Sequence, residues 1–102
     1  MGKVSVIATL RAKEGQADAF TAAFAELFPH VENEPGTEQY ILHRSTTDPD
    51  VFFVTEVYAD QAAFDAHAGS DAFKQLGAAI GDAIESFEMQ FAEPEKAVGL
   101  DL

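Results

Sequence analysis

Residues 52–67 read FFVTEVYADQAAFDAH and run on through AGSDAFK, and this stretch decides the fold. Its apolar first half predicts a strand. Asp60 is a good N-cap for a short helix, Gly69 ends that helix, and Ser70 caps a second one. Glu56 lies in the middle of the most hydrophobic strand of the chain. Because desolvating an unpaired carboxylate costs free energy, we expect Glu56 either at an opening to water or at a site of chemistry.

Length and composition indicate one soluble domain spanning residues 1–102, in the cytoplasm. The chain is 47% hydrophobic with nine Phe, and it has no apolar run long enough to cross a bilayer and no signal peptide at its start. The absence of cysteine excludes disulfides and thiolate chemistry. A net charge of −12 argues against nucleic-acid binding, because phosphates would be repelled.

The rest of the chain supplies three further strands and one long helix. Alternating side chains predict strands at 3–11, 37–45 and 86–91, besides the strand at 51–58, and apolar residues at three- and four-residue steps predict a helix over 16–32. Pro29 falls inside that helix and predicts a kink or an early end. The order is β-α-β-β-α-β, which predicts an α+β ferredoxin-like fold with an antiparallel four-stranded sheet.

The strands at 37–45 and 51–58 are joined by a short loop, so we expect a hairpin in which Ile41 lies opposite Glu56. In this register one sheet face collects residues that we expect on the side left bare by the helices: Gln39, Ile41, His43, Phe52, Val54, Glu56 and Tyr58. A bare apolar face of this size predicts a homodimer that packs sheet against sheet and encloses a pocket in each subunit. The tail at 93–102 is expected to pack on the partner.

Three motifs carry a resemblance to a known family. They are Glu34-Pro35-Gly36 followed by Tyr40, the segment FVTEVYAD at 53–60, and AFDAH at 63–67 followed by Gly69-Ser70. At these spacings the chain resembles the antibiotic biosynthesis monooxygenase (ABM) family of dimeric α+β barrels over nearly its whole length. It departs from the family at two places. Tyr58 stands where Trp is commoner, and Ser70-Asp71-Ala72 stands where Thr-Pro-His is often found.

The resemblance implies a cofactor-independent monooxygenase that oxidises a quinol-like or polyphenolic molecule with O2. The family also implies two alternatives, an isomerase of a small hydroxy-carbonyl compound, as in autoinducer-2 processing, and a non-catalytic ligand-binding dimer. Haem degradation is disfavoured, because the axial histidine and the tryptophan of that branch are replaced by Gly77 and His67.

Six residues are candidates for the site. Glu56 and His67 are the expected catalytic residues, and the expected substrate-binding residues are Tyr40, His43, Phe52 and Tyr58. Burial would raise the pKa of Glu56 and suit it to act as a base, and tyrosine hydroxyls can donate to a substrate oxyanion. Each also has a plainer interpretation as a core or hydrogen-bonding residue. No histidine pair has metal-ligand spacing, so we expect no metal and no cofactor.

Overall fold

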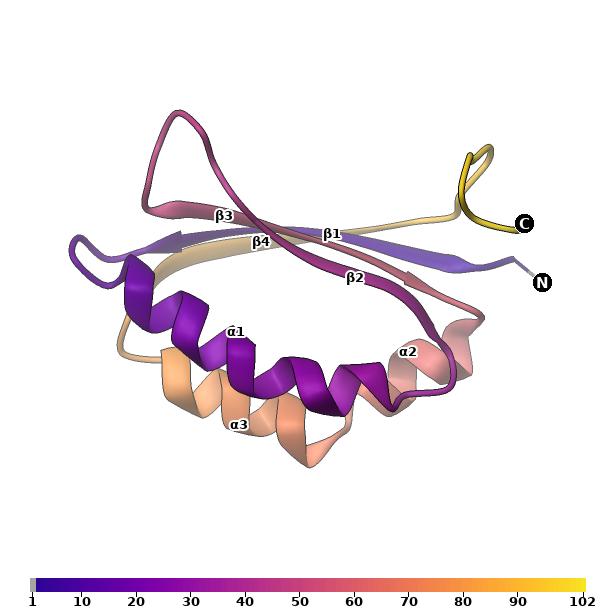
Figure 1. Ribbon diagram of the computed structural model, residues 1–102, viewed down its shortest axis with the longest axis horizontal. Coiled ribbons are helices and arrows are strands. Elements are labelled where there is room, and N and C mark those ends of the chain that lie inside the picture. The colour runs from indigo at the N-terminus through magenta and orange to yellow at the C-terminus, as the bar shows by residue number, and fades with distance from the viewer. Residues whose placement is uncertain (1) are drawn as a thin grey trace.

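The computed structural model describes residues 2–102 as an antiparallel sheet with its helices layered on one face (Figure 1). The elements are β1 (Val4–Ala12), α1 (Ala17–Glu32), β2 (Thr37–Arg44), β3 (Val51–Tyr58), α2 (Gln61–Ala68), α3 (Asp71–Ile80) and β4 (Ile84–Ala92). The strand order β2-β3-β1-β4 is that of a ferredoxin-like sheet. The predicted α+β fold is confirmed, with the second helical region divided into α2 and α3.

The helix boundaries follow from capping residues. The Asp60 carboxylate accepts a hydrogen bond from the Ala63 amide at 2.8 Å, and the Ser70 hydroxyl accepts one from the Phe73 amide at 3.1 Å. Pro29 does not end α1, which continues to Glu32. Tertiary packing of the apolar face of α1 therefore outweighs the backbone hydrogen bond that the proline removes.

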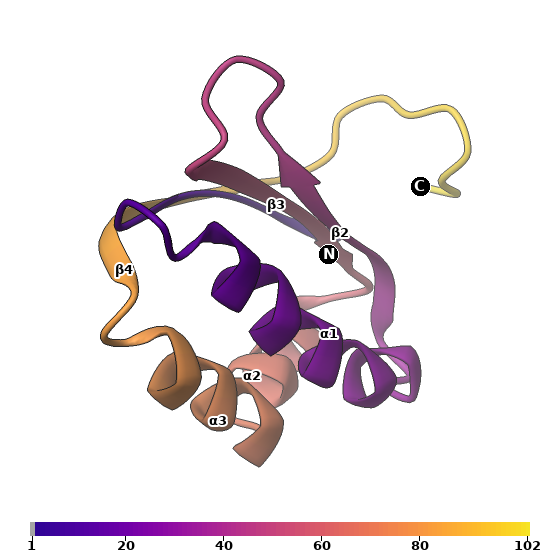
Figure 2. The same cartoon turned by 60° about the vertical axis from the view of Figure 1, so that its left-hand side comes forward.

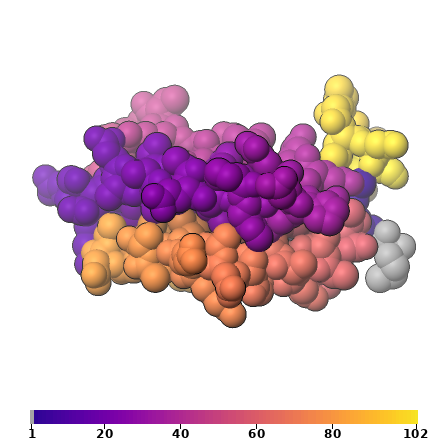
Figure 3. Space-filling view, turned by 60° about the horizontal axis from the view of Figure 1, so that its bottom comes forward, coloured from indigo at the N-terminus to yellow at the C-terminus, as the bar shows by residue number. Residues whose placement is uncertain are grey.

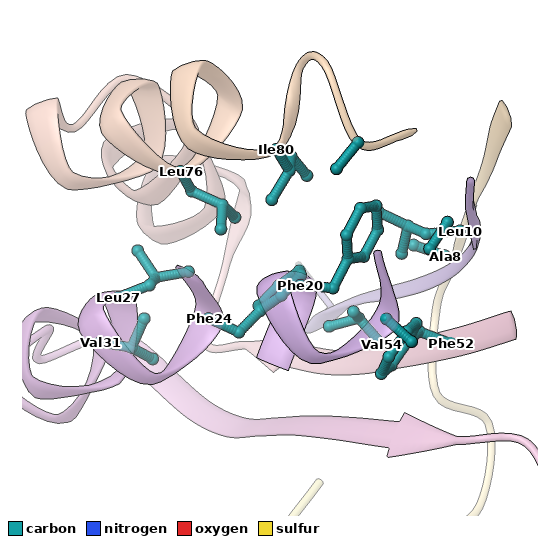
Figure 4. Close-up of a cluster of buried hydrophobic side chains, with 13 residues drawn as sticks. Ala8, Leu10, Phe20, Phe24, Leu27, Val31, Phe52, Val54, Leu76 and Ile80 are labelled. Atoms are coloured by element: carbon teal, nitrogen blue, oxygen red, sulfur yellow. The ribbon is translucent and has the colours of Figure 1, made fainter. Parts of the chain in front are cut away.

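The core lies between the helix layer and the inner face of the sheet (Figure 4). Phe20 and Phe24 of α1, Leu76 of α3 and Val54 of β3 converge there. Phe20 stacks on Phe52 with ring centroids 5.5 Å apart. In the space-filling view α1 runs alongside α3 and α2, and together they cover this face of the sheet (Figure 3).

The register of β2 against β3 differs from the predicted one. Tyr40, not Ile41, lies opposite Glu56, and the pairing shifts by one residue between Thr37 and Gln39. Because side chains alternate along a strand, this change moves every β2 side chain to the other face relative to β3. Tyr40 therefore shares a face with Glu56, and Ile41 lies on the opposite face.

The side of the sheet that the helices cover also differs from the prediction. The alternating β3 residues Phe52, Val54, Glu56 and Tyr58 are all buried on the inner face, beneath the helices. Figure 2 shows the helices on one side of the sheet only. The uncovered outer face instead carries large apolar side chains that are 37–44% exposed, namely Ile7, Ile41 and Phe53.

The segment after β4 turns away from the helix layer and ends near the N-terminal end of β1 (Figure 1). Val98 is fully exposed and Leu102 is 55% exposed. Packing of this tail on a partner subunit stays a prediction. Within residues 2–102, none of the helices has the length and apolar character needed to span a membrane.

Candidate active site

A cavity of about 240 Å³ lies between the helix layer and the inner face of the sheet. Its described lining contains two polar side chains, Glu56 and Tyr40, which stand opposite each other on β3 and β2. The other lining residues are apolar or glycine: Ala8, Leu10, Phe24, Val54, Phe73, Leu76, Gly77, Ile80, Gly81, Ile84, Phe87 and Met89. A mostly apolar cavity with a few convergent polar groups is typical of a small-molecule site.

Glu56 is the only carboxylate among these lining residues, and it is 6% exposed. Burial raises its pKa to about 7, the hydrogen bond from Tyr58 opposes the rise, and the nearby charge of Glu34 adds to it. The Tyr58 hydroxyl donates to Glu56 Oε1 at 2.5 Å. A carboxylate with this pKa exchanges a proton readily near neutral pH, which is the property of a general base.

Both tyrosines keep their hydroxyl protons at neutral pH. Burial, followed by the charge of Glu56, raises the pKa of Tyr40 and of Tyr58 above its usual value. Tyr58 donates its proton to Glu56. Tyr40 lines the cavity, and its ring packs edge-on against Phe28 at 5.5 Å. Tyr40 is therefore the cavity residue suited to donate a hydrogen bond to a bound oxygen.

His67 is buried behind the cavity wall. It is 1% exposed, and its ring lies 5.3–5.4 Å, between centroids, from the rings of Tyr40, Tyr58 and Phe73. Tyr40 and Phe73 line the cavity, whereas His67 is not part of its described lining. His67 Nε2 is buried and has no hydrogen-bond partner among the described residues.

Glu34 holds His67 in place. Its carboxylate lies 3.0 Å from His67 Nδ1, and because a carboxylate accepts, Nδ1 carries the hydrogen. Glu34 also accepts from the Thr37 hydroxyl at 2.7 Å and lies 3.1 Å from Nε2 of the half-exposed His30. From the sequence, Glu34 was identified only as part of a family motif, and this role was not predicted. The signal available was its place in the Glu34-Pro35-Gly36 motif that precedes Tyr40.

Three of the four predicted substrate-binding residues are not part of the described cavity lining: Tyr58, whose hydroxyl contacts Glu56 instead, His43 and Phe52. His43 is on the outer face of the sheet, where Nε2 lies 2.8 Å from the Thr55 hydroxyl. Its expected place on the same face as Glu56 is therefore wrong, and the cause is the register shift. Phe52 is on the same face as Glu56 but is buried in the core against Phe20, with the Arg44 guanidinium 5.4 Å from its ring centroid. The structure thus brings together Glu56, Tyr58, Tyr40 and His67.

Among residues 2–102 no group of three or more potential ligand side chains is arranged to hold a metal ion. The cavity itself offers one carboxylate and one phenol, and its other described lining atoms belong to apolar residues and glycines. The residues that could contact a ligand are thus suited to an uncharged, largely apolar molecule with a hydroxyl or carbonyl group.

The fold and the cavity define a ferredoxin-like domain that is built to bind a small molecule between its helices and its sheet. The family model described as antibiotic biosynthesis monooxygenase matches residues 3–79. This match covers most of the chain, so the chain belongs to that family, and the predicted membership is confirmed.

Solved structures agree with this assignment. A Caulobacter crescentus protein, provisionally described as an antibiotic biosynthesis monooxygenase, is 35% identical, with 93% of this chain and 92% of that chain covered at a TM-score of 0.88. A Shewanella oneidensis protein is 30% identical, with 91% of each chain covered at a TM-score of 0.86. A protein from Nitrosomonas europaea shares the fold at 20% identity, with 97% of each chain covered at a TM-score of 0.89. No curated protein matches the chain.

Proposed function

We propose that this protein is a cofactor-independent monooxygenase that oxidises a small quinol-like or polyphenolic molecule with O2. The observation that carries the proposal is Glu56, a buried carboxylate with a pKa of about 7 in the wall of an otherwise largely apolar cavity. Membership of the monooxygenase family and the Caulobacter crescentus relative support it.

Glu56 takes a proton from a substrate hydroxyl or activated C–H group, and the resulting anion passes one electron to O2. The two radicals combine to form a peroxide anion on the substrate. Glu56 returns its proton to this peroxide and gives a hydroperoxide. Glu56 then removes the second hydrogen of the same carbon as a proton, the electron pair of that C–H bond forms the C=O bond, and the O–O bond breaks. The leaving hydroxide takes the proton and departs as water. For an anthrone the CH2 group becomes C=O, so that one oxygen atom enters the product and the other leaves as water. The substrate supplies all the electrons, and no separate reductant is required.

The residues around Glu56 have distinct roles in this proposal. Tyr40 donates a hydrogen bond to the developing substrate oxyanion. Tyr58 orients Glu56 through the 2.5 Å hydrogen bond, and this hydrogen bond partly offsets the rise in the pKa of Glu56. His67 is a positioning residue, because it contacts the rings of both tyrosines from behind the cavity wall.

The cavity also limits the substrate. Its volume of about 240 Å³ is below the roughly 300–1,000 Å³ usual for drug-sized ligands, which favours a compact molecule of no more than three fused rings. None of the described lining residues is a cation, and Glu56 already places one acidic group in the cavity. A phosphorylated or strongly anionic substrate would therefore be disfavoured.

A second candidate is an isomerase of a small hydroxy-carbonyl compound. The same observation favours it, because a carboxylate with a pKa near 7 can move a proton between two adjacent carbons as readily as it can start an oxidation. The lack of a cation in the described lining restricts this candidate to uncharged compounds.

Oxygen consumption with reduced menadione and with an anthrone tests the proposal. Glu56→Gln keeps an oxygen that can accept from Tyr58 but cannot take a proton, so we expect turnover to fall by about 10²–10⁴-fold. Wild-type turnover should rise with pH up to about 7, where Glu56 becomes ionised. The matched control is Glu26→Gln, which makes the same carboxylate-to-carboxamide change at an exposed position of α1 and should leave the rate unchanged.

Two outcomes would contradict the proposal. Equal turnover by wild type and Glu56→Gln would remove Glu56 from the chemistry. No oxygen uptake by the wild type, together with interconversion of a hydroxy-carbonyl compound that Glu56→Gln abolishes, would establish the isomerase instead.

We also propose a homodimer formed through the outer face of the sheet. Ile7, Ile41 and Phe53 leave an apolar patch there, and such patches commonly mark interfaces. Sedimentation velocity should give a dimer at micromolar concentration for the wild type and a shift to monomer for Ile41→Glu. A wild-type monomer would refute the dimer.

A further inference from the structure

Two glycines line the cavity wall at α3: Gly77 in the interior of the helix, and Gly81, the C-cap that follows its last residue. Neither has a positive φ, so neither is required by the backbone conformation. Glycine is the least favourable residue after proline inside a helix. Gly77, in the interior of α3, therefore needs a reason for its presence that outweighs the helix stability it costs.

The two positions differ in the space around them. A Cβ atom added at Gly81 would lie 3.2 Å from the carbonyl oxygen of Gly77, so close approach to the backbone accounts for Gly81. A Cβ atom added at Gly77 would meet no atom within 4 Å. Packing therefore does not account for Gly77, which is part of the cavity lining and has open space where a side chain would begin.

Gly77 is solvent-exposed as well as part of the cavity lining, so it stands where the cavity meets the surface. On the β4 side the same cavity is lined by Phe87, which is 67% exposed, and Met89, which is 37% exposed. β4 is an edge strand of the sheet, and Figure 2 shows its first residues on the same side of the molecule as α3. These residues place the opening of the cavity between α3 and β4, with Glu56 on the sheet behind it.

We propose that Gly77 determines the size of aromatic substrate that the cavity admits, by keeping this opening free of a side chain. The inference rests on the proposed oxidation of a small aromatic molecule. A flat ring can pass between α3 and the apolar side chains of β4 and bring a hydroxyl to Glu56. A side chain at position 77 narrows the passage without touching Glu56 or its partner Tyr58.

The test compares Gly77→Ala and Gly77→Leu with Ala79→Leu, which adds the same side chain at an exposed α3 position outside the cavity lining. Oxygen uptake is measured with a one-ring methylhydroquinone, two-ring reduced menadione and a three-ring anthrone. We expect Gly77→Leu to lower kcat/KM at least tenfold for the anthrone and least for the one-ring quinol, mainly through KM. Ala79→Leu should leave all three values unchanged.

Thermal unfolding shows whether each variant is folded. Gly77→Ala should raise Tm by about 2–6 °C, because alanine favours the helix and has free space at this position. A Gly77→Leu variant that is folded but keeps the wild-type ratio of kcat/KM between the anthrone and the one-ring quinol would overturn the proposal.

Binding of oxidised menadione, measured by calorimetry, separates this proposal from the proposed reaction. If the wild type binds menadione but does not consume oxygen, the reaction fails and the role of Gly77 is still tested. Weaker binding to Gly77→Leu, by at least tenfold, then supports the size limit, and unchanged binding refutes it. Ala79→Leu is again the control and should bind as the wild type does.

Discussion

Glu34 and Glu56 are two shielded carboxylates with very different hydrogen-bond partners. Thr37, His30 and His67 surround Glu34 within hydrogen-bond distance, whereas among the described side chains Tyr58 alone donates to Glu56. The carboxylate with three partners ties the end of α1 to the start of β2 and to α2. The carboxylate with one partner, in the cavity wall, is the one that burial leaves ready to accept a proton.

The two carboxylates differ both in burial and in hydrogen-bond partners, since Glu56 is buried and Glu34 is only partly buried. A buried carboxylate whose lone pairs are mostly occupied holds its neighbours in position, and removing it leaves their donors unpaired. A buried carboxylate with few partners is itself destabilised when charged. These two situations predict different responses to substitution and to pH.

The largest effect on stability is expected at Glu56. Its pKa of about 7 in the folded protein exceeds its ordinary value of 4.5, so the folded state holds the proton more tightly than the unfolded state. Wild-type stability should therefore fall as pH rises from about 4.5 to about 7 and level off above, by up to about 3 kcal/mol. Glu56→Gln does not titrate and should lack this decline, which urea unfolding at several pH values would measure.

If the free energy of unfolding changed with pH in the same way for the wild type and Glu56→Gln, this expectation would be contradicted, and Glu56 would not differ from Glu34 in the way described above. Glu26→Gln is the control again, because removing an exposed carboxylate of α1 should preserve the wild-type decline between pH 4.5 and 7.

A smaller effect is expected at Glu34. Glu34→Ala removes the acceptor for His67 Nδ1 and the Thr37 hydroxyl, leaving the donor of His67 buried without a partner, and should lower the free energy of unfolding by about 1–3 kcal/mol. Glu34→Gln keeps one oxygen acceptor and should cost less. Chemical denaturation at pH 7 measures both.

His30→Gln sharpens the same comparison. His30 is 44% exposed at its side chain, so losing its contact with Glu34 should change stability by less than about 1 kcal/mol. A loss at His30→Gln as large as that at Glu34→Ala would mean that the exposed partner, and not buried His67, accounts for the role of Glu34.

Sequence patterns predicted most elements, because their signals are local. Asp60 and Ser70 mark the starts of α2 and α3, and alternation places Glu56 and Tyr58 on one face of β3. The alternation of side chains along β3 did not reveal which face of the sheet the helices cover. Phe53 and Val57 make the opposite face of β3 apolar as well, so either face could have been the buried one.

The site was harder to predict, because it depends on pairings distant in the sequence. The shift between Thr37 and Gln39 brings Tyr40, rather than Ile41 or His43, to the face of Glu56, and no local signal marks that irregularity. The contact of Glu34 with His67 joins residues 33 positions apart. The family motifs and the side-chain types pointed to Glu56, Tyr40, Tyr58 and His67, which lie near one another in the structure, but not to Glu34, the carboxylate that contacts the histidine.

Gly77 has a further consequence for the motions of the protein. Helix α3 has 10 residues with a glycine in its interior, whereas α1, beside it over the same core, has 16 residues and none. Helix α1 contains Pro29, but it buries five side chains where α3 buries two. Local unfolding of α3 should therefore require less free energy than that of α1, and the amide hydrogens of α3 should exchange with solvent sooner. Helix α3 is then the part of the cavity wall that opens most readily, and it lies opposite the strand that carries Glu56.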